Sequence, residues 1–171
     1  IDQIDIEREK HGLDDAIVID IGGTTSDIGV LQGGFPRESN VVIEVGGVRT
    51  NFRMPDILAI GLGGGSLDAA DGMTVGPRSV GHRLVEEAVV FGGNTLTATD
   101  IAVAEGAAQI GDPARVSELG GDTIASARAT MNDMLARGVD TMSPGEQPLP
   151  VVLVGGGAVL AASFETAGPL V

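Results

Sequence analysis

The chain contains no cysteine, no tryptophan and no tyrosine, two histidines and a single lysine, Lys10. The missing thiols exclude disulfides, zinc–thiolate sites and cysteine nucleophiles. The two histidines, His11 and His82, are too far apart in sequence to indicate a zinc site by spacing. Because aromatic residues make up only 2% of the sequence, the core has to be built from Val, Ile, Leu, Ala and Met.

Basic residues are scarce too, since 10 Lys and Arg stand against 24 Asp and Glu and give a formal net charge of −14. This charge repels nucleic-acid backbones and anionic lipid heads, so we expect neither nucleic acid nor a membrane surface as a partner. We find no signal peptide and no apolar run long enough to span a bilayer, which makes a cytoplasmic location the expectation. The sequence has no G-x-x-x-x-G-K-[ST] run, which excludes a P-loop. A bound nucleotide would need backbone N–H groups and a metal ion.

Glycine, by contrast, is abundant at 27 residues. The most informative stretch, residues 17–30, reads IVIDIGGTTSDIGV. Its two apolar runs around a Gly-Gly-Thr-Thr centre are typical of a strand, a tight turn and a second strand. Gly22 and Gly23 allow backbone N–H groups to approach a ligand closely, and Thr24 and Thr25 offer hydroxyls.

Asp20 and Asp27 stand at the two mouths of this turn. Carboxylates there could hold a hydrated Mg²⁺ against a phosphate chain. The pattern therefore favours a phosphate-binding turn. An ordinary hairpin loop also uses Gly, Asp and Thr, so the motif alone leaves that alternative open.

Two further glycine runs occur, at residues 60–66 and 155–157. The first permits a close backbone approach, although a surface turn would look the same. Pro55 before it indicates an irregular or edge segment. The second follows an apolar strand pattern and fits either a ligand loop or tight packing of a strand against a helix. Ser66 is not a serine-hydrolase nucleophile, because Asp68 stands where the G-x-S-x-G frame requires glycine.

Apolar patterning predicts the remaining elements. We expect strands over residues 16–21, 27–31 and 41–45, a short strand pair over 67–75 turned at 71–72, a strand or mixed segment over 84–91, and a buried strand over 150–154. We expect helices over residues 2–13, over 101–108 with Thr99 or Asp100 as the N-cap, and over 122–137 with Gly138 as the stop.

Taken together, these motifs resemble a known family. The DIGGTTSD stretch at residues 20–27 is similar to a phosphate-binding hairpin of the actin-like ATPase superfamily. The runs at 60–66, 75–81 and 97–100 resemble those of the hydantoinase/oxoprolinase family in order and spacing. Residues 155–157 resemble the adenosine-side loop of actin-like ATPases. The sequence departs from the commonest family pattern at 82–87, which leaves the substrate class open.

The resemblance implies a ribonuclease H-like α/β fold, a mixed sheet with helices on its faces. It implies that residues 1–171 form a single actin-like ATPase domain, the second half of a longer protein whose partner domain lies upstream of Ile1. Family members use ATP to open five-membered cyclic amides such as hydantoin, N-methylhydantoin or 5-oxoproline through a phosphorylated amide, with or without a second hydantoinase subunit. We therefore expect ATP and Mg²⁺ as cofactors and an inactive isolated domain.

The resemblance also suggests roles for single residues. Asp20 and Asp27 are expected at Mg²⁺ or its waters. The phosphates are assigned to Gly22, Gly23, Thr24 and Thr25, and the adenosine side to Gly155, Gly156 and Gly157. The cleft is expected to be lined by Gly63, Gly64, Gly65 and Ser66. Asp100 is a catalytic candidate whose simpler role is helix capping. Two alternatives stay open: an ATPase or nucleotide-binding module that depends on a macromolecular partner, and a structural domain without nucleotide binding.

Overall fold

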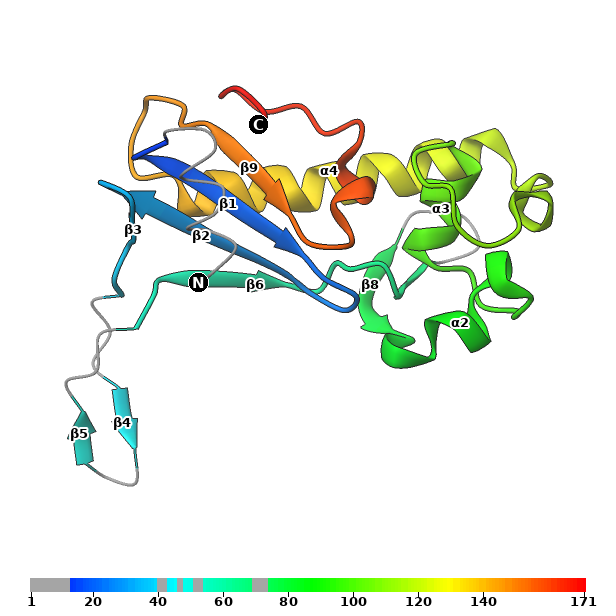
Figure 1. Cartoon of the computed structure of the whole chain (residues 1–171), viewed down its shortest axis with the longest axis horizontal. Helices are drawn as coiled ribbons and strands as arrows, with labels where there is room; N and C mark the ends of the chain where they lie inside the picture. The colour runs from blue at the N-terminus through cyan, green and yellow to red at the C-terminus, as the bar shows by residue number, and fades with distance from the viewer. Residues whose placement is uncertain (1–12, 40–42, 46–47, 51–53, 69–73) are drawn as a thin grey trace.

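The computed structural model describes residues 13–39, 43–45, 48–50, 54–68 and 74–171 (Figure 1). The helix expected over residues 2–13 and the turn expected at 71–72 lie outside these ranges, apart from Leu13. Within them, no helix combines the length and apolarity needed to cross a membrane.

A mixed five-stranded sheet forms the centre of the structure. Its strands are β1 (Ala16–Ile21), β2 (Ser26–Gln32), β3 (Phe35–Pro36), β6 (Ile57–Ile60) and β9 (Val151–Val154). The order is β3-β2-β1-β9, and β6 also pairs with β2. β9 runs parallel to β1 and the other pairs are antiparallel. The strands expected over 16–21, 27–31 and 150–154 are thus confirmed, and the segment after Pro55 is an edge strand.

The two faces of the sheet carry different side chains because strand residues alternate. Ile17, Ile19 and Ile21 of β1 pack into the main core, with Ile28 and Val30 of β2. A smaller cluster on the other face contains Ala16, Val18, Leu31 and Val152. Burial of β1 on both faces explains its continuous apolar run.

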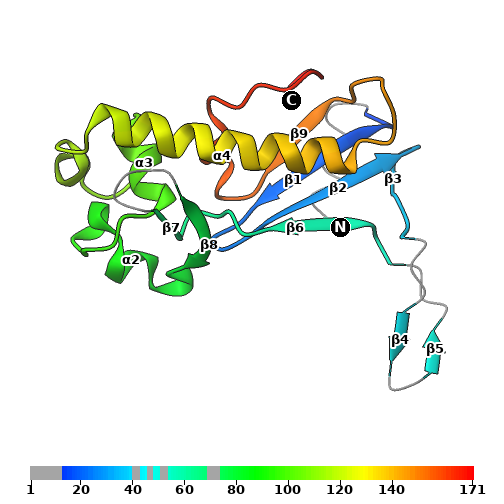
Figure 2. The same cartoon turned by 180° about the vertical axis from the view of Figure 1, so that it is seen from behind.

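Helix α4 (Gly121–Met142) lies across one face of the sheet, as Figure 2 shows. Its buried side includes Ala127, Met131 and Leu135, as the periodicity predicts. The expected stop at Gly138 is wrong, because the helix continues to Met142. Gly138 is buried, and a Cβ there would overlap Cδ1 of Ile28. This glycine therefore allows close packing of helix on sheet and does not end the helix.

The shorter elements lie outside the main sheet. They are β4 (Ile43–Val45), β5 (Val48–Thr50), β7 (Ser66–Asp68), β8 (Val75–Ser79), η1 (Gly81–Arg83), α2 (Leu84–Glu87), η2 (Val89–Phe91), α3 (Ala98–Ala104), η3 (Pro113–Val116) and η4 (Ala158–Ala161). The expected pair over 67–75 is present as β7 and β8. The third expected strand belongs to a separate β4–β5 hairpin.

The prediction of a strand or mixed segment over 84–91 is confirmed as mixed, since short helices α2 and η2 occupy it and Ala88 between them forms an isolated bridge with Thr95. The N–H of Val90 donates to the Asp100 carboxylate, and the carbonyl of Glu87 accepts from the N–H of Thr95.

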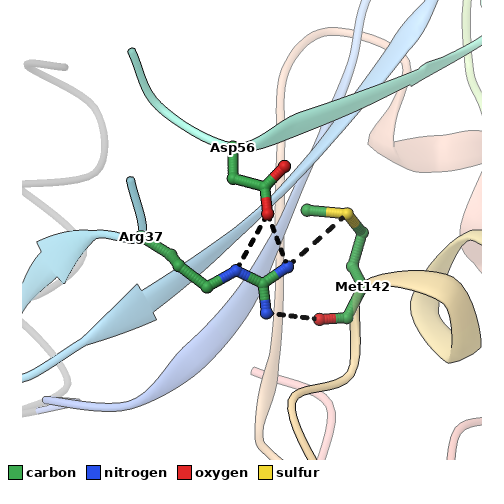
Figure 3. A network of polar contacts seen from close by, with 3 residues as sticks. All are labelled: Arg37, Asp56 and Met142. Carbon is green, nitrogen blue, oxygen red and sulfur yellow. Dashed lines mark hydrogen bonds and ion pairs between the residues drawn. The ribbon is translucent and has the colours of Figure 1, made fainter. Parts of the chain in front are cut away.

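Arg37, just after β3, ties the end of α4 to the start of β6 (Figure 3). Its Nε and Nη2 lie 3.1 and 3.0 Å from Oδ2 of Asp56, and its Nη1 donates to the carbonyl of Met142 at 3.1 Å. A cation at a helix C-terminus also interacts favourably with the helix dipole. This contact fixes the end of the sheet opposite the β1–β2 turn.

Candidate nucleotide site

The β1–β2 turn projects from the end of the sheet toward β8 (Figure 1). The N–H of Gly22 donates to the carbonyl of Thr25 at 2.9 Å and closes the turn. Gly23, Thr24 and Thr25 are exposed, so the tip of the turn lies at the surface. This arrangement offers several hydrogen-bond donors to an anion.

Asp20 and Asp27 are direct neighbours across the β1–β2 ladder. Both are exposed on the sheet face opposite α4, and both border a pocket of about 210 Å³ with a largely apolar floor that includes Val18, Leu31 and Val154. Among the described residues, neither carboxylate has an ion-pair or hydrogen-bond partner. Two like charges placed opposite each other destabilise a sheet, so an outside cation would be favourable here.

The carboxylate pair suits Mg²⁺ better than a metal held by protein ligands alone. In the described ranges, no group of three or more His, Cys, Asp or Glu side chains could enclose a metal. Mg²⁺ commonly keeps several waters and uses one or two carboxylates together with phosphate oxygens. Asp20 and Asp27 beside an exposed Gly-Thr-Thr turn fit that donor set.

The glycine run at residues 60–66 lies directly beneath the turn. The N–H groups of Gly64 and Gly65 donate to the carbonyls of Gly22 and Gly23, at 3.0 and 2.7 Å. A Cβ on Gly63 would lie 2.5 Å from the backbone nitrogen of Thr24. The backbones therefore lie in contact, which leaves no room for a side chain at Gly63.

Most residues of this run do not face solvent. Gly63, Gly64, Gly65 and Ser66 are all buried. The Ser66 hydroxyl accepts from the N–H of Gly63 at 2.9 Å, inside the loop. In this structure they support the turn, whereas the sequence suggested that they line a cleft.

The block at residues 75–81 also contacts the glycine run. The N–H of Val80 donates to the carbonyl of Gly65 at 2.9 Å. A Cβ on Gly61 would lie 2.7 Å from Cβ of Pro77. The sequence indicates this block as a family motif, but it does not predict these contacts.

The block at residues 97–100 forms the start of α3. The N-cap is Thr97, not Thr99 or Asp100 as expected. Asp100 is the N3 residue of a capping box, and its carboxylate accepts from the amide and hydroxyl of Thr97 and from the amide of Val90, at 2.7–2.8 Å. Asp100 is fully buried, and its carboxylate stabilises the helix start, the simpler of the two roles suggested by the sequence.

The third glycine loop joins the end of β1. The N–H of Gly157 donates to the carbonyl of Ile21 at 2.8 Å. Gly155 has φ +89°, and a Cβ there would overlap Oδ1 of Asp20. Gly156 is exposed. The loop and the β1–β2 turn thus lie side by side at the same end of the sheet.

Solved structures share this fold. The ATP-dependent caprolactamase from Pseudomonas jessenii superposes with a TM-score of 0.66 at 26% sequence identity, over 91% of this chain and 27% of that one. Nucleotide-free acetone carboxylase superposes with a TM-score of 0.65 at 18% identity, over 91% of this chain and 26% of that one. These matches confirm the actin-like ATPase fold. The chain spans about a quarter of the length of either structure.

The family is given by a match to a family model. A comparison with curated proteins finds no match. The family model described as hydantoinase/oxoprolinase matches residues 5–112, which is more than half of the chain and includes the β1–β2 turn, the glycine run and the α3 start. The chain therefore belongs to the hydantoinase/oxoprolinase family.

Proposed function

We propose that this chain binds Mg-ATP at the end of its sheet and belongs to an ATP-dependent hydrolase that opens five-membered cyclic amides. The observation that carries the proposal is the pair Asp20 and Asp27, which has no partner among the described residues and lies beside an exposed Gly-Thr-Thr turn. Family membership supports the reaction class, as does the likeness to a caprolactamase that is itself ATP-dependent.

The proposed roles follow the positions of the residues. Asp20 and Asp27 hold Mg²⁺ or its waters. The phosphates lie against Gly22, Gly23, Thr24 and Thr25 and are bound by donors of the turn other than the Gly22 amide, which closes the turn, while Gly155, Gly156 and Gly157 lie against the adenosine side. The bound ion would neutralise phosphate charge, which a chain with a net charge of −14 cannot do with its own cations. The remainder of the cleft comes from a domain upstream of Ile1, with or without a second subunit.

The reaction explains the need for ATP. A ring amide is a poor electrophile because its nitrogen donates electrons into the carbonyl. The amide oxygen attacks the γ-phosphorus and ADP leaves. One water then adds to the activated carbon, the ring C–N bond breaks, and a second water releases inorganic phosphate. Such chemistry depends on positioning and charge neutralisation, which exposed amides and hydroxyls on a fixed turn provide.

The decisive experiment measures ADP release by the full-length protein with Mg-ATP, alone and with 5-oxoproline, hydantoin or N-methylhydantoin. Stimulation by one ring compound is expected and would name the substrate class. ATP binding without stimulation by any of them would instead favour a partner-dependent ATPase. Absence of any Mg-ATP effect on melting would favour a structural domain.

Asp20→Asn tests the metal role in the same assay. We expect it to lower ATP turnover and weaken the dependence on Mg²⁺. Asp140→Asn is the matched control, because Asp140 is an exposed acid near the C-terminal end of α4, away from the β1–β2 turn. Full turnover by Asp20→Asn would refute the metal assignment.

A further inference from the structure

The carbonyl of Gly64 accepts two hydrogen bonds from one residue that is distant in sequence. Thr99 donates to it through Oγ1 at 2.8 Å and through its backbone N–H at 3.0 Å. Thr99 is the second residue of α3, where helix N–H groups have no partner inside the helix. Thr99 is only 6% exposed. The carbonyl of Gly64 therefore accepts from both the backbone amide and the side-chain hydroxyl of Thr99 at the start of α3.

Gly64 is also hydrogen-bonded to the β1–β2 turn. Its own N–H donates to the carbonyl of Gly22, and the N–H of Gly65 donates to that of Gly23. The tight approach of Gly63 to Thr24 leaves no room for the two backbones to move closer together. A shift of Gly64 must therefore shift the turn.

The start of α3 is well fixed. The capping box between Thr97 and Asp100 satisfies two further amides, and Asp100 also holds the amide of Val90. Both residues of the capping box are fully buried. Thr99 thus projects from a well-bonded helix start onto Gly64, which has no side chain of its own.

We propose that Thr99 is a positioning residue for the nucleotide site, which acts through Gly64 on the conformation of the β1–β2 turn. This inference rests on the proposed function only for its effect on ATP. The hydroxyl is the critical group, because a methyl carbon cannot approach a carbonyl oxygen as closely as the 2.8 Å of this hydrogen bond. Valine has nearly the same shape as threonine but lacks the hydroxyl donor. Thr99→Val would therefore displace Gly64 and, with it, the carbonyls of Gly22 and Gly23.

Three variants of the full-length protein test the inference. Thr99→Val removes the hydroxyl, and Thr99→Ser restores it without the methyl group. Val103→Ala is the control for general weakening, because Val103 is buried in the same helix but lies at its other end. The measurements are hydrogen exchange at the amides of Gly22, Gly64 and Gly65, and the Kd for Mg-ATP.

We expect Thr99→Val to accelerate exchange at these three amides more than Val103→Ala does at equal loss of stability. It should weaken Mg-ATP binding about fivefold, the effect of one ordinary hydrogen bond, with Thr99→Ser within about twofold of the natural protein. Equal exchange in Thr99→Val and Val103→Ala would overturn the inference, as would unchanged Mg-ATP binding by Thr99→Val.

The exchange measurement needs no nucleotide, so the inference and the proposed function fail separately. If the natural protein does not bind Mg-ATP, the proposed function is refuted. Exchange at Gly22, Gly64 and Gly65 then still decides whether Thr99 fixes the turn.

Discussion

Asp20 and Asp27 face each other across the β1–β2 ladder as two exposed acids, with no cation paired to them in the described part of the chain. Strand sequences usually avoid like charges in this relationship, because repulsion weakens the pair. A pair that is unfavourable for the fold is a reasonable place to bind a cation. A substitution at this pair should also change stability and cation binding in opposite directions, so the two effects can be measured separately.

Asp27→Asn should stabilise the protein in the absence of Mg²⁺. Relief of the repulsion is expected to raise the free energy of unfolding by a few tenths of a kcal/mol. Urea denaturation in EDTA measures this gain, which should shrink at high salt because exposed charges are screened. The same variant should bind Mg-ATP more weakly. A loss of stability in EDTA would contradict the repulsion argument.

Gly23→Ala and Gly156→Ala probe ligand contact without disturbing the fold. Both glycines are exposed, and an added Cβ meets no atom within 4 Å at either position. We expect each variant to keep its stability within about 1 kcal/mol and to weaken Mg-ATP binding about tenfold, since the methyl group would occupy space proposed for the nucleotide.

Gly145→Ala is the control for these two variants. Gly145 is also exposed and open, but it lies in the loop after α4. Isothermal calorimetry should show unchanged Mg-ATP binding for this variant. Equal affinities of all three variants would refute the placement of phosphate or adenosine at residues 23 and 156.

Gly138→Ala should destabilise the protein even though alanine favours helices. The added Cβ would overlap Cδ1 of Ile28, which is fully buried. Overpacking costs about 1–3 kcal/mol, whereas the gain in helix propensity is about 1 kcal/mol. Thermal denaturation should show a net loss.

Ile28→Val removes the obstructing Cδ1 and provides the matching background. On its own it should cost about 0.5–1.5 kcal/mol, as other Ile to Val changes do. In this background Gly138→Ala should become neutral or stabilising. Simple additivity of the two changes would show that the overlap is relieved in another way.

Glu105 gives the protein a predictable pH dependence. Burial raises the pKa of its carboxyl above the ordinary value of 4.5, although Arg128 at 3.2 Å opposes the shift. A raised pKa means that the folded state favours the protonated form. The stability contributed by Glu105 is therefore complete below pH 4.5 and is lost as the pH rises through the pKa of the folded state.

Glu105→Gln should therefore be at least as stable as the natural protein at pH 7, with a difference below about 1 kcal/mol. This advantage should decrease between pH 7 and pH 4. Urea denaturation at both pH values measures it, and Glu146→Gln controls for the loss of one exposed negative charge. An advantage that grows toward pH 4 would contradict the sign of the pKa shift.

Several elements were predictable because their signals are local. The β1–β2 hairpin follows from two apolar runs around Gly-Gly-Thr-Thr, and β9 follows from an apolar run that ends in glycines. The buried side of α4 follows from helical periodicity. In each case neighbouring residues contain the pattern, so one sequence was sufficient.

Other predictions failed where distant residues decide. Gly138 has the local chemistry of a helix stop, but α4 continues because Ile28 of β2 fills the space beside it. The segment over 84–91 is mixed as predicted, and the carboxylate of Asp100 accepts a hydrogen bond from its amide at Val90. Thr97 could have been recognised as the N-cap, because Asp100 follows three residues later as in a capping box.

The fold class, the family and the Gly-Thr-Thr turn are predictable from the sequence, because each depends on short motifs of neighbouring residues. Which residues support that turn depends on contacts between segments that are far apart in the chain. The glycine run is buried beneath it, and Thr99 holds Gly64 across 35 positions of sequence. Most of these contacts join backbone groups, which every residue possesses, and the hydroxyl of Thr99 meets its acceptor only in the folded chain, so residue identity does not reveal them.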